Sequence, residues 1–414
     1  MTARNGAGQP AERRSRPDPA LPATRSNGGP LPVPAGRSVD PVPSAILDPA
    51  LPRPALHRPA LRTLRLGLVQ LTDAAPVLVA EELGLFDAVG LRVTLSAEGA
   101  WAAVRDKLAF GALDAAQLLG PMPIALAAGL DGVRSQVTVG AGLGANGNTL
   151  TLSLPLAEAI GRFTRPLPAA SFAAALRRRA AAGRPVTLGV VFPYSSHNYL
   201  LRWWLASGGL DPDRDLRLVT VPPPLCAGRL AEGAIDGFCA GEPWGSHAVE
   251  RGLGTIALSS GDIWPNHPEK VLAFAAGYAA RDPESAIACT AAIIAAARWL
   301  DAPENQAEAV HILQRRLFPA LGAREIAAAF EGTAEGWLQA APLRFRTATL
   351  PRREQAAWWL RQMRRWGHVP AGLTEATALS PWRQDLWRAA AARLREVEPP
   401  PPAPPPGEPA DRDR

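Results

Sequence analysis

Two side chains that suit the recognition of an anion stand where the sequence predicts helix starts. His197 follows Ser195-Ser196 in FPYSSHNYLLRWWL, where a serine can cap the helix. His197 would then lie in the first turn, where free backbone N–H groups and the helix dipole favour an anion. A surface histidine at a helix start is the alternative interpretation.

Trp101 is the second candidate, because it follows Glu98-Gly99-Ala100 at the end of a predicted strand and opens the next helix. Open α/β sheets bind their ligands at the carboxyl ends of strands. The indole N–H is a donor without an acceptor, which suits an anion. A tryptophan of the core is the alternative, and spacing alone favours it.

The segments GEPWG and DIWPNHPEKVL hold a second group of polar and aromatic residues near strand ends. They are Glu242, Trp244, Trp264, His267 and Lys270. Lys270 is one of two lysines among 44 basic residues and falls in a predicted loop. His247 and His267 have no companion carboxylate or cysteine pattern, so a metal site is weakly indicated, and we predict no metal or cofactor.

Sequence motifs of catalysis and nucleotide binding are not found. GLGANG (142–147) has the G-x-G-x-x-G spacing, but the alternating residues TLTLS follow it, which indicates a strand rather than the helix that a dinucleotide site requires. We interpret it as a turn between strands. The chain also has no G-x-S-x-G, P-loop, H-E-x-x-H or C-x-x-C motif, so we predict that it is not an enzyme.

Composition allows a sizeable core, since 47% of the 414 residues are hydrophobic and 20% are charged. The three cysteines, Cys226, Cys239 and Cys289, are too few and scattered for a disulfide framework and are predicted to be reduced core residues. The net charge of +6 comes almost wholly from arginines spread without a basic block, which argues against nucleic-acid binding.

Both ends of the chain differ in composition from the body. Residues 1–60, rich in Pro, Ala, Gly and Arg, and the Pro-rich tail 397–414 are predicted to be disordered. Arg13-Arg14 is not followed by the apolar stretch of an export signal, and no apolar run approaches the roughly 20 residues of a membrane span. We expect a cytoplasmic protein without a membrane span, with the periplasm as the alternative.

Between these ends, strand-like and helix-like patterns alternate. Predicted strands include 64–71, 92–99, 115–119, 186–192, 216–222, 237–241 and 271–277. Alternation of this kind predicts an α/β fold of mainly parallel sheets covered by helices. The number of strands exceeds the need of one small sheet and a helix-rich end follows, which fits two lobes joined by a crossover chain.

Several segments together resemble the nitrate- and bicarbonate-binding proteins of ABC transporters. The stretch that begins LRLGLVQLTDAAPVLVAEELGLFDAVGLRV carries the resemblance first. NGNTLTLS, YSSHNYLLRWWL, GEPWG and WPNHPEKVLAF continue it in the same order. No single motif is decisive, but the order and spacing over about 62–280 are specific.

The resemblance implies a two-lobed fold of the periplasmic-binding-protein type II kind, with a hinged cleft between the lobes. On this reading residues 61–150 and 268–396 form the first lobe and 151–267 the second. The anion-contacting residues implied are Trp101, Asn148, His197 and Lys270. Asn148 departs from the glutamine associated with the transporter nitrate binders, which makes its contact the least secure. Gln117 and Glu242 are assigned to the cleft wall.

The resembling proteins include exported transporter components and a cytoplasmic, NasS-like sensor branch. The sensor releases an antitermination regulator, NasT-like, when nitrate or nitrite binds. Because we find no export signal, we predict a nitrate/nitrite sensor with that partner. The alternative is the substrate-binding component of a nitrate or bicarbonate transporter, whose partner is an ABC permease. An enzyme of thiamine-precursor synthesis on the same fold is a remote rival.

Nitrate is planar, singly charged and accepts hydrogen bonds only, so its site needs donors and about one balancing charge. Lys270 can provide the charge, and Trp101, Asn148 and His197 the donors. Bicarbonate also carries an O–H, which needs an acceptor such as a carboxylate, and the sequence offers no confident candidate. We therefore expect nitrate or nitrite as the ligand.

Overall fold

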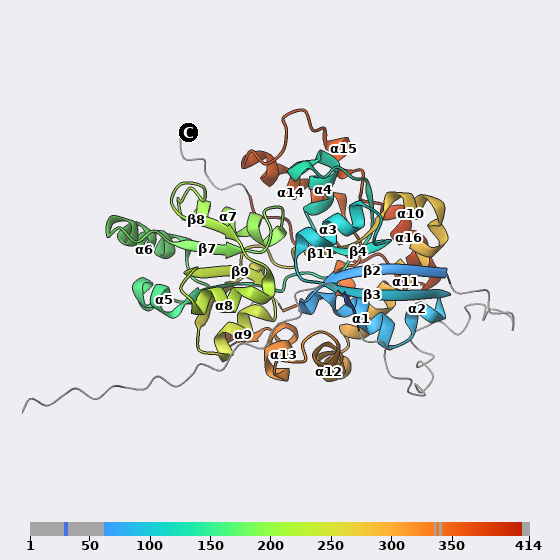
Figure 1. Ribbon diagram of the computed structural model, residues 1–414, viewed down its shortest axis with the longest axis horizontal. Helices are drawn as coiled ribbons and strands as arrows, with labels where there is room; N and C mark the ends of the chain where they lie inside the picture. The colour runs from blue at the N-terminus through green and yellow to red at the C-terminus, as the bar shows by residue number, and fades with distance from the viewer. Residues whose placement is uncertain (1–28, 32–61, 335–336, 339–341, 408–414) are drawn as a thin grey trace, which may run out of the picture.

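The computed structural model describes residues 29–31, 62–334, 337–338 and 342–407. Two sheets form two lobes that lie side by side, each covered by helices (Figure 1). The predicted α/β class with two lobes is therefore confirmed. Most of the head that we predicted to be disordered, residues 1–60, lies outside the described residues.

The first lobe contains a six-stranded mixed sheet in the order β1-β3-β2-β4-β11-β5. Strands β2, β3 and β4 are parallel, whereas β11 is antiparallel to both β4 and β5. The chain therefore returns from the second lobe into the middle of the first sheet. The strands are β1 (Gly29–Pro30), β2 (Arg62–Val69), β3 (Leu91–Glu98), β4 (Ala115–Leu119), β5 (Val137–Gly142) and β11 (Lys270–Ala275).

The second lobe contains a five-stranded sheet in the order β10-β6-β9-β7-β8. Its strands are β6 (Asn148–Ser153), β7 (Thr187–Val190), β8 (Arg217–Thr220), β9 (Gly237–Gly241) and β10 (Gly254–Ser259). Every residue of β6, β9 and β10 is buried, as expected for strands covered by helices on both faces. A short hairpin, β12 (Thr333–Ala334) with β13 (Trp337–Leu338), lies outside both sheets.

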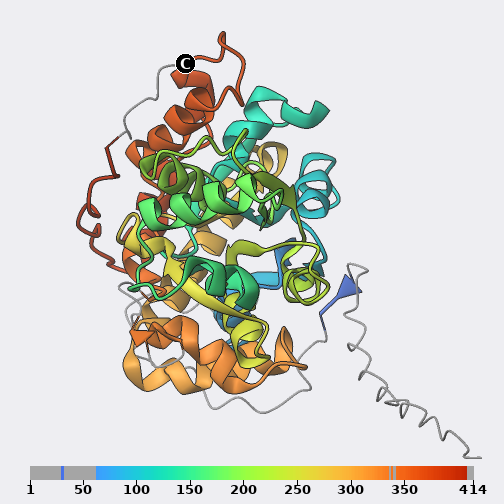
Figure 2. The same ribbon diagram turned by 90° about the vertical axis from the view of Figure 1, so that its left-hand side faces the viewer.

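Helices cover both sheets, and the C-terminal helices surround the junction of the lobes (Figures 1 and 2). The second lobe carries α5 (Leu154–Ile160), α6 (Ala169–Ala181), α7 (Ser196–Ser207), α8 (Cys226–Ala231) and α9 (Trp244–Glu250). The first lobe carries α1 (Ala75–Glu82), α2 (Leu85–Ala88), α3 (Trp101–Ala109), α4 (Met122–Ala128), α10 (Ala276–Arg281) and α11 (Pro283–Leu300). The C-terminal part adds α12 (Gln306–Arg316), α13 (Ala323–Glu331), α14 (Arg353–Arg365), α15 (Glu375–Leu379) and α16 (Gln384–Arg393).

Helix α11 is the central helix of the first lobe, and most of its residues are buried against α1 and α16. Among the described residues, no single helix is both long and apolar enough for a membrane span. The pair Pro283–Leu300 and Pro303–Arg316 meets that test only together, and it is bent by 93°. The three cysteines are free and buried, as the sequence predicted.

Two segments, 143–147 and 260–269, carry the chain between the lobes. The first is most of GLGANG, which joins two strands as predicted rather than a strand to a helix. Gly147 has φ +83°, and a Cβ there would lie 2.5 Å from the side chain of Leu343, so glycine is required. Strand β6 belongs to the second lobe from Asn148 onward, three residues before the lobe boundary that we predicted.

Residues 397–407 of the Pro-rich tail lie against the body of the protein, contrary to the disorder that we predicted there, and residues 408–414 lie outside the described residues. Its backbone carbonyls accept three hydrogen bonds from side chains. Arg352 donates to Pro399 O, the Trp264 indole donates to Ala403 O over 3.0 Å and the Trp203 indole donates to Gly407 O over 2.7 Å. Proline removes backbone donors but keeps carbonyl acceptors, so indole and guanidinium donors can hold such a segment.

Candidate functional site

The four residues predicted to contact an anion lie at the starts of four elements that meet at the junction of the lobes. Trp101 opens α3 and Lys270 opens β11 in the first lobe. Asn148 opens β6, and His197 lies in the first turn of α7, in the second lobe. All four are buried. Helix α7 begins as predicted, because Ser195 caps it by accepting from Asn198 N over 3.2 Å.

Lys270 is a buried strand residue, whereas we predicted that it falls in a loop. Its Nζ lies 2.8 Å from Asp73 Oδ2 and 2.5 Å from Glu269 Oε2, and 5.9 Å above the ring of Trp101. A lysine is rarely buried unless it is paired, and here two carboxylates pair it. The local pattern could not reveal this, since Asp73 is far away in the sequence. Both carboxylates raise the pKa of Lys270 despite its burial.

Glu269 connects Lys270 to the second lobe. Its Oε1 accepts from Ser196 Oγ over 2.5 Å and from Asn148 Nδ2, while Oε2 faces Lys270. Burial alone would raise the pKa of Glu269, but the neighbouring Lys270, with smaller contributions from two histidines, outweighs it and holds that pKa at about 2. The carboxylate is therefore ionised although it is completely buried.

Asp73 lies on the other side of Lys270, in the short 3-10 helix Thr72–Ala74 after β2. Its Oδ1 accepts from Gln117 Nε2 over 2.6 Å, and Gln117 Oε1 in turn accepts from Val69 N over 2.9 Å. Burial, reinforced by nearby Glu269, raises the pKa of Asp73. Gln117, which we predicted to line the cleft wall, is a buried residue of β4 that orients Asp73.

His197 is neutral and carries its proton on Nδ1. Its Nε2 accepts from Val191 N, 3.4 Å away, and lies 2.9 Å from Ser195 Oγ. Because a backbone N–H can only donate, the Val191 contact favours the tautomer with its lone pair on Nε2 and its proton on Nδ1. Burial lowers the pKa of His197 to about 3, which keeps the ring neutral. His197 can therefore offer one N–H donor, at Nδ1.

Three buried polar atoms of the predicted site have no hydrogen-bond partner within the described part of the chain. They are the indole Nε1 of Trp101, Nδ1 of His197 and Oδ1 of Asn148. Buried polar groups are nearly always paired, so an unpaired group indicates a ligand, an ion or a water. Two of these atoms are donors and one is an acceptor. We call Asp73, Trp101, Asn148, Ser196, His197, Glu269 and Lys270 the junction cluster.

Glu242 lies after β9, outside these contacts. Its Oε2 accepts from Ser246 N over 3.0 Å, and its backbone carbonyl accepts from Thr72 N over 2.8 Å. Burial raises the pKa of Glu242 to about 7, although hydrogen bonds from Ser246 and Thr149 act in the opposite direction. Its link to the junction cluster is through the backbone of Thr72, next to Asp73.

The two histidines considered for a metal do not meet. His267 Nδ1 donates to Pro268 O over 3.1 Å and its Nε2 accepts from Ser260 Oγ over 2.7 Å, whereas His247 pairs with Glu325 over 2.9 Å. No group of three or more metal-ligating side chains is found among the described residues.

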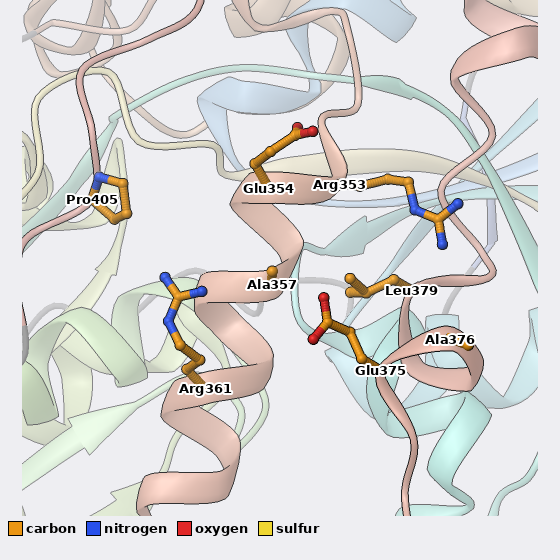
Figure 3. A pocket seen from close by; sticks show the side chains of 8 residues that line it. All are labelled: Arg353, Glu354, Ala357, Arg361, Glu375, Ala376, Leu379 and Pro405. Carbon is orange, nitrogen blue, oxygen red and sulfur yellow. The ribbon is translucent and has the colours of Figure 1, made fainter.

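The junction cluster lies apart from three pockets that are lined by described residues. A pocket of about 720 Å³ lies between α14 and α15, lined by the charged side chains of Arg353, Glu354, Arg361 and Glu375 (Figure 3). These four residues are exposed. None of the predicted anion-contacting residues lines this pocket or the two smaller ones of about 340 and 330 Å³. All seven residues of the cluster are buried between the lobes.

Sequence reasoning missed three members of the junction cluster: Asp73, Ser196 and Glu269. Asp73 had a usable signal, because it directly follows the first predicted strand, where α/β sheets hold ligands. Ser196 was considered only as a helix cap. Glu269 had no local signal beyond its place beside Lys270, because the donors that hold its carboxylate lie over 70 residues away.

Comparison with known proteins gives one family. The model of the NMT1-like family matches residues 57–314. The nitrate/nitrite binding protein NrtA of Synechococcus elongatus is 32% identical, over 80% of this chain and 77% of that protein. The bicarbonate-binding protein CmpA of the same species is 31% identical, over 80% of this chain and 78% of that protein.

Among solved structures, the periplasmic nitrate-binding protein NrtA from Synechocystis PCC 6803 superposes with a TM-score of 0.75. It is 30% identical, and the match covers 81% of this chain and 90% of that one. This confirms the predicted two-lobed periplasmic-binding-protein fold. The chain also matches transport ATP-binding proteins, but it spans only 46% of their length.

Proposed function

Because this chain belongs to the NMT1-like family, we propose that it binds a small planar oxyanion, nitrate or nitrite, as the substrate-binding component of an ABC transporter. The relatives that it matches over most of their length are binding proteins, which agrees with the predicted absence of catalysis. Their names include nitrate, nitrite and bicarbonate as ligands, so the choice among these anions depends on the geometry of the site.

The observation that carries the proposal is the pair of unpartnered donors beside a buried lysine. Trp101 Nε1 and His197 Nδ1 are buried without a partner among the described residues, and Lys270 Nζ lies 5.9 Å above the ring of Trp101. A buried donor without an acceptor costs about 1–3 kcal/mol. An acceptor-only anion would remove that cost at both donors, which favours nitrate or nitrite.

The position of these donors suits a ligand that holds the lobes together. Trp101 and Lys270 belong to the first lobe and His197 to the second. An anion that contacts all three stabilises the closed arrangement and leaves an open one unaffected. Binding and lobe closure are therefore coupled, as a transporter needs for recognising a loaded protein.

Bicarbonate is the second candidate, because the junction cluster contains acceptors. We preferred nitrate on the ground that the sequence offered no acceptor for a ligand O–H. Asn148 Oδ1 is a buried acceptor without a partner among the described residues, and Glu269 places a carboxylate beside it. An O–H of bicarbonate could donate to either oxygen. The lack of an acceptor is therefore no longer a reason to prefer nitrate over bicarbonate.

The sensor role that we predicted remains a hypothesis with less support than the transport role. It depended on the cytoplasmic location, and the relatives named above include no sensor. The two roles differ in partner and compartment. A sensor would hold an antitermination regulator in the cytoplasm, and a transport component would meet an ABC permease at the membrane surface.

Calorimetry with nitrate, nitrite, bicarbonate, sulfate and chloride, each at the same ionic strength, tests the ligand. We expect saturable binding of nitrate and nitrite and none of chloride or sulfate. The melting temperature offers an independent measure, since a ligand at 100 times its Kd stabilises the protein by about 2.7 kcal/mol. Tighter binding of bicarbonate than of nitrate would select the second candidate, and no binding of any of the three would contradict the proposal.

Cell fractionation followed by affinity capture tests the role. The transport proposal expects the full chain outside the cytoplasm and capture of permease components from detergent-solubilised membranes. Recovery in the cytosol, with a regulator that is retained without nitrate and released with it, would instead establish the sensor.

A further inference from the structure

Two of the four predicted anion donors are already occupied by a carboxylate of the chain itself. Lys270 Nζ contacts Glu269 Oε2 over 2.5 Å, and Asn148 Nδ2 donates to Glu269 Oε1. Ser196 Oγ adds a third donor to the same Oε1 over 2.5 Å. The other two predicted donors, on Trp101 and His197, have no partner within the described chain. Two of the four predicted donors therefore contact Glu269, and the other two lack an acceptor among the described residues.

A carboxylate resembles the proposed ligands in the features that these donors recognise. It is planar, carries one negative charge and presents two equivalent oxygens, as nitrite does, and nitrate adds a third. Glu269 uses one oxygen for the lobe-two donors Asn148 and Ser196 and the other for Lys270 of the first lobe. Glu269 thus bridges the two lobes in the way that a bound external anion would.

We propose that Glu269 acts as an internal anion that competes with the external oxyanion for Lys270 and Asn148, and so sets the affinity of the site. This inference rests on the proposed function. To bind nitrate, the protein must withdraw the Glu269 carboxylate from these donors or neutralise it. Glu269 is then a specificity-determining residue, because it penalises every anion that cannot take over both donors.

The charges of the cluster give the reason for this competition. Lys270 contributes one positive charge, and Asp73 and Glu269 contribute one negative charge each when ionised, both in contact with Lys270. The lysine is therefore fully neutralised before any ligand enters. A further anion beside the ionised Glu269 would be repelled in a buried site of low dielectric constant.

Proton uptake can relieve this repulsion and gives the competition a pH dependence. The titratable groups that face Glu269 are Lys270, His267, His197 and Asp73, with Cys239 close by. In the free protein Lys270 holds the pKa of Glu269 at about 2, despite the opposing effect of burial. Once nitrate takes Lys270, that pKa must rise. The complex then binds a proton that the free protein does not, so nitrate affinity increases as the pH falls.

The test is calorimetry of nitrate binding to the full chain and to Glu269→Gln at about pH 8 and about pH 5.5, on the two sides of the ordinary range of histidine titration. Glutamine keeps the shape and an acceptor for Asn148 and Ser196 but removes the competing charge. We expect at least about tenfold tighter binding than wild type at the higher pH, the effect of one charge-assisted contact. The pH dependence should be much smaller in the variant.

Asp301→Asn is the matched control, because Asp301 is a carboxylate of the first lobe that accepts from the backbone of Phe345 and Arg346 and contacts none of the cluster donors. It should leave the nitrate affinity unchanged. A crystal structure of the nitrate complex provides a second measurement that does not depend on a variant, and should show Glu269 withdrawn from Asn148 and Lys270.

Weaker binding by Glu269→Gln, or a nitrate complex in which Glu269 still contacts both donors, would overturn the inference and make Glu269 a positioning residue. Equal affinity and equal pH dependence of variant and wild type would overturn it as well. These outcomes differ from failure of the proposed function, in which neither protein binds nitrate, nitrite or bicarbonate at either pH.

Discussion

Glu269 and Glu242 are both 1% exposed and both lie close to the junction of the lobes, yet their carboxyl groups differ in charge. Lys270 outweighs the burial of Glu269 and holds its pKa at about 2, whereas burial raises that of Glu242 to about 7. Glu242 accepts a backbone N–H from Ser246 and forms no salt bridge with the described residues. Burial therefore does not decide the charge of a carboxyl group, and the nearest ion does.

The difference in pKa between Glu269 and Glu242 also distinguishes two kinds of buried carboxyl group. An ionised carboxylate that is held by a lysine and by donors from both lobes can exchange these partners with a ligand. A carboxyl group that is partly protonated near neutral pH, with neutral donors from its own lobe, has no ion-pair partner to exchange. Glu269 is for this reason the candidate for ligand competition and Glu242 is a structural acid.

The largest expected effect comes from removing the ion that distinguishes the two acids. Lys270→Ala leaves Asp73 and Glu269 without their cation, and breaking a buried pair in this way costs about 3–5 kcal/mol of folding free energy. Urea unfolding at about pH 7 should show this loss, and calorimetry should show nitrate binding weakened by at least roughly 10- to 150-fold. A lysine in a loop, where we predicted Lys270, would contribute little to folding, whereas the paired Lys270 of β11 is expected to contribute much.

The stability lost in Lys270→Ala should shrink as the pH falls. In the wild type Glu269 has a depressed pKa, so its stabilising contribution is present above the ordinary pKa of glutamate and disappears as the pH falls toward about 2. In the variant, Asp73 and Glu269 become neutral by taking up protons as the pH falls, so the missing cation costs less stability at low pH. A loss of stability that is the same at all pH values would contradict the ion pairing of Lys270 with Glu269 and Asp73.

Glu242→Gln should have the next largest effect, with the opposite sign. The pKa of Glu242 is raised from 4.5 to about 7 by burial, so the folded protein binds a proton more tightly than the unfolded chain and loses stability as the pH rises between these values. A difference of this size corresponds to at most about 3 kcal/mol. Glutamine should recover about 2–3 kcal/mol at about pH 8 and none at about pH 4. Equal stabilisation by Glu242→Gln at both pH values would contradict the raised pKa of Glu242.

His197→Ala tests the neutral donor of the junction cluster. It removes one hydrogen bond to the ligand, worth about 0.5–1.5 kcal/mol, so nitrate should bind roughly two- to tenfold more weakly. Because burial lowers the pKa of His197 to about 3, the ring stays neutral, and the factor should be the same at about pH 5.5 and about pH 8. His247→Ala, which removes a histidine paired with Glu325 instead, is the control. A factor that grows at low pH would mean that His197 acts as a cation.

Arg361→Ala should have the smallest effect, although it changes a charge in the largest of the three pockets described above (Figure 3). Arg361 is exposed on α14, where water screens its charge, so stability should change by less than about 0.5 kcal/mol. Nitrate affinity should not change. A loss of nitrate binding would show that the exposed pocket, rather than the junction cluster, is the anion site.

Local patterns in the sequence determined most of the elements and the positions of the four predicted donors. Strands β4 and β9 were predicted with their observed bounds, and a serine cap of α7, by Ser195 or Ser196, was predicted and is made by Ser195. Such features depend on alternation, on helical spacing and on capping side chains within a few residues. The resemblance to a known family then placed Trp101, Asn148, His197 and Lys270 in one site.

Only the tertiary structure decided which charges are buried and what they contact. Lys270 was predicted in a loop, and its burial depends on Asp73, which lies almost 200 residues away. The Pro-rich tail was predicted to be disordered, and its contacts depend on the indoles of Trp203 and Trp264. A buried ion pair or a docked segment without periodic pattern leaves no local signature, because its stability comes from partners that only the folded chain brings together.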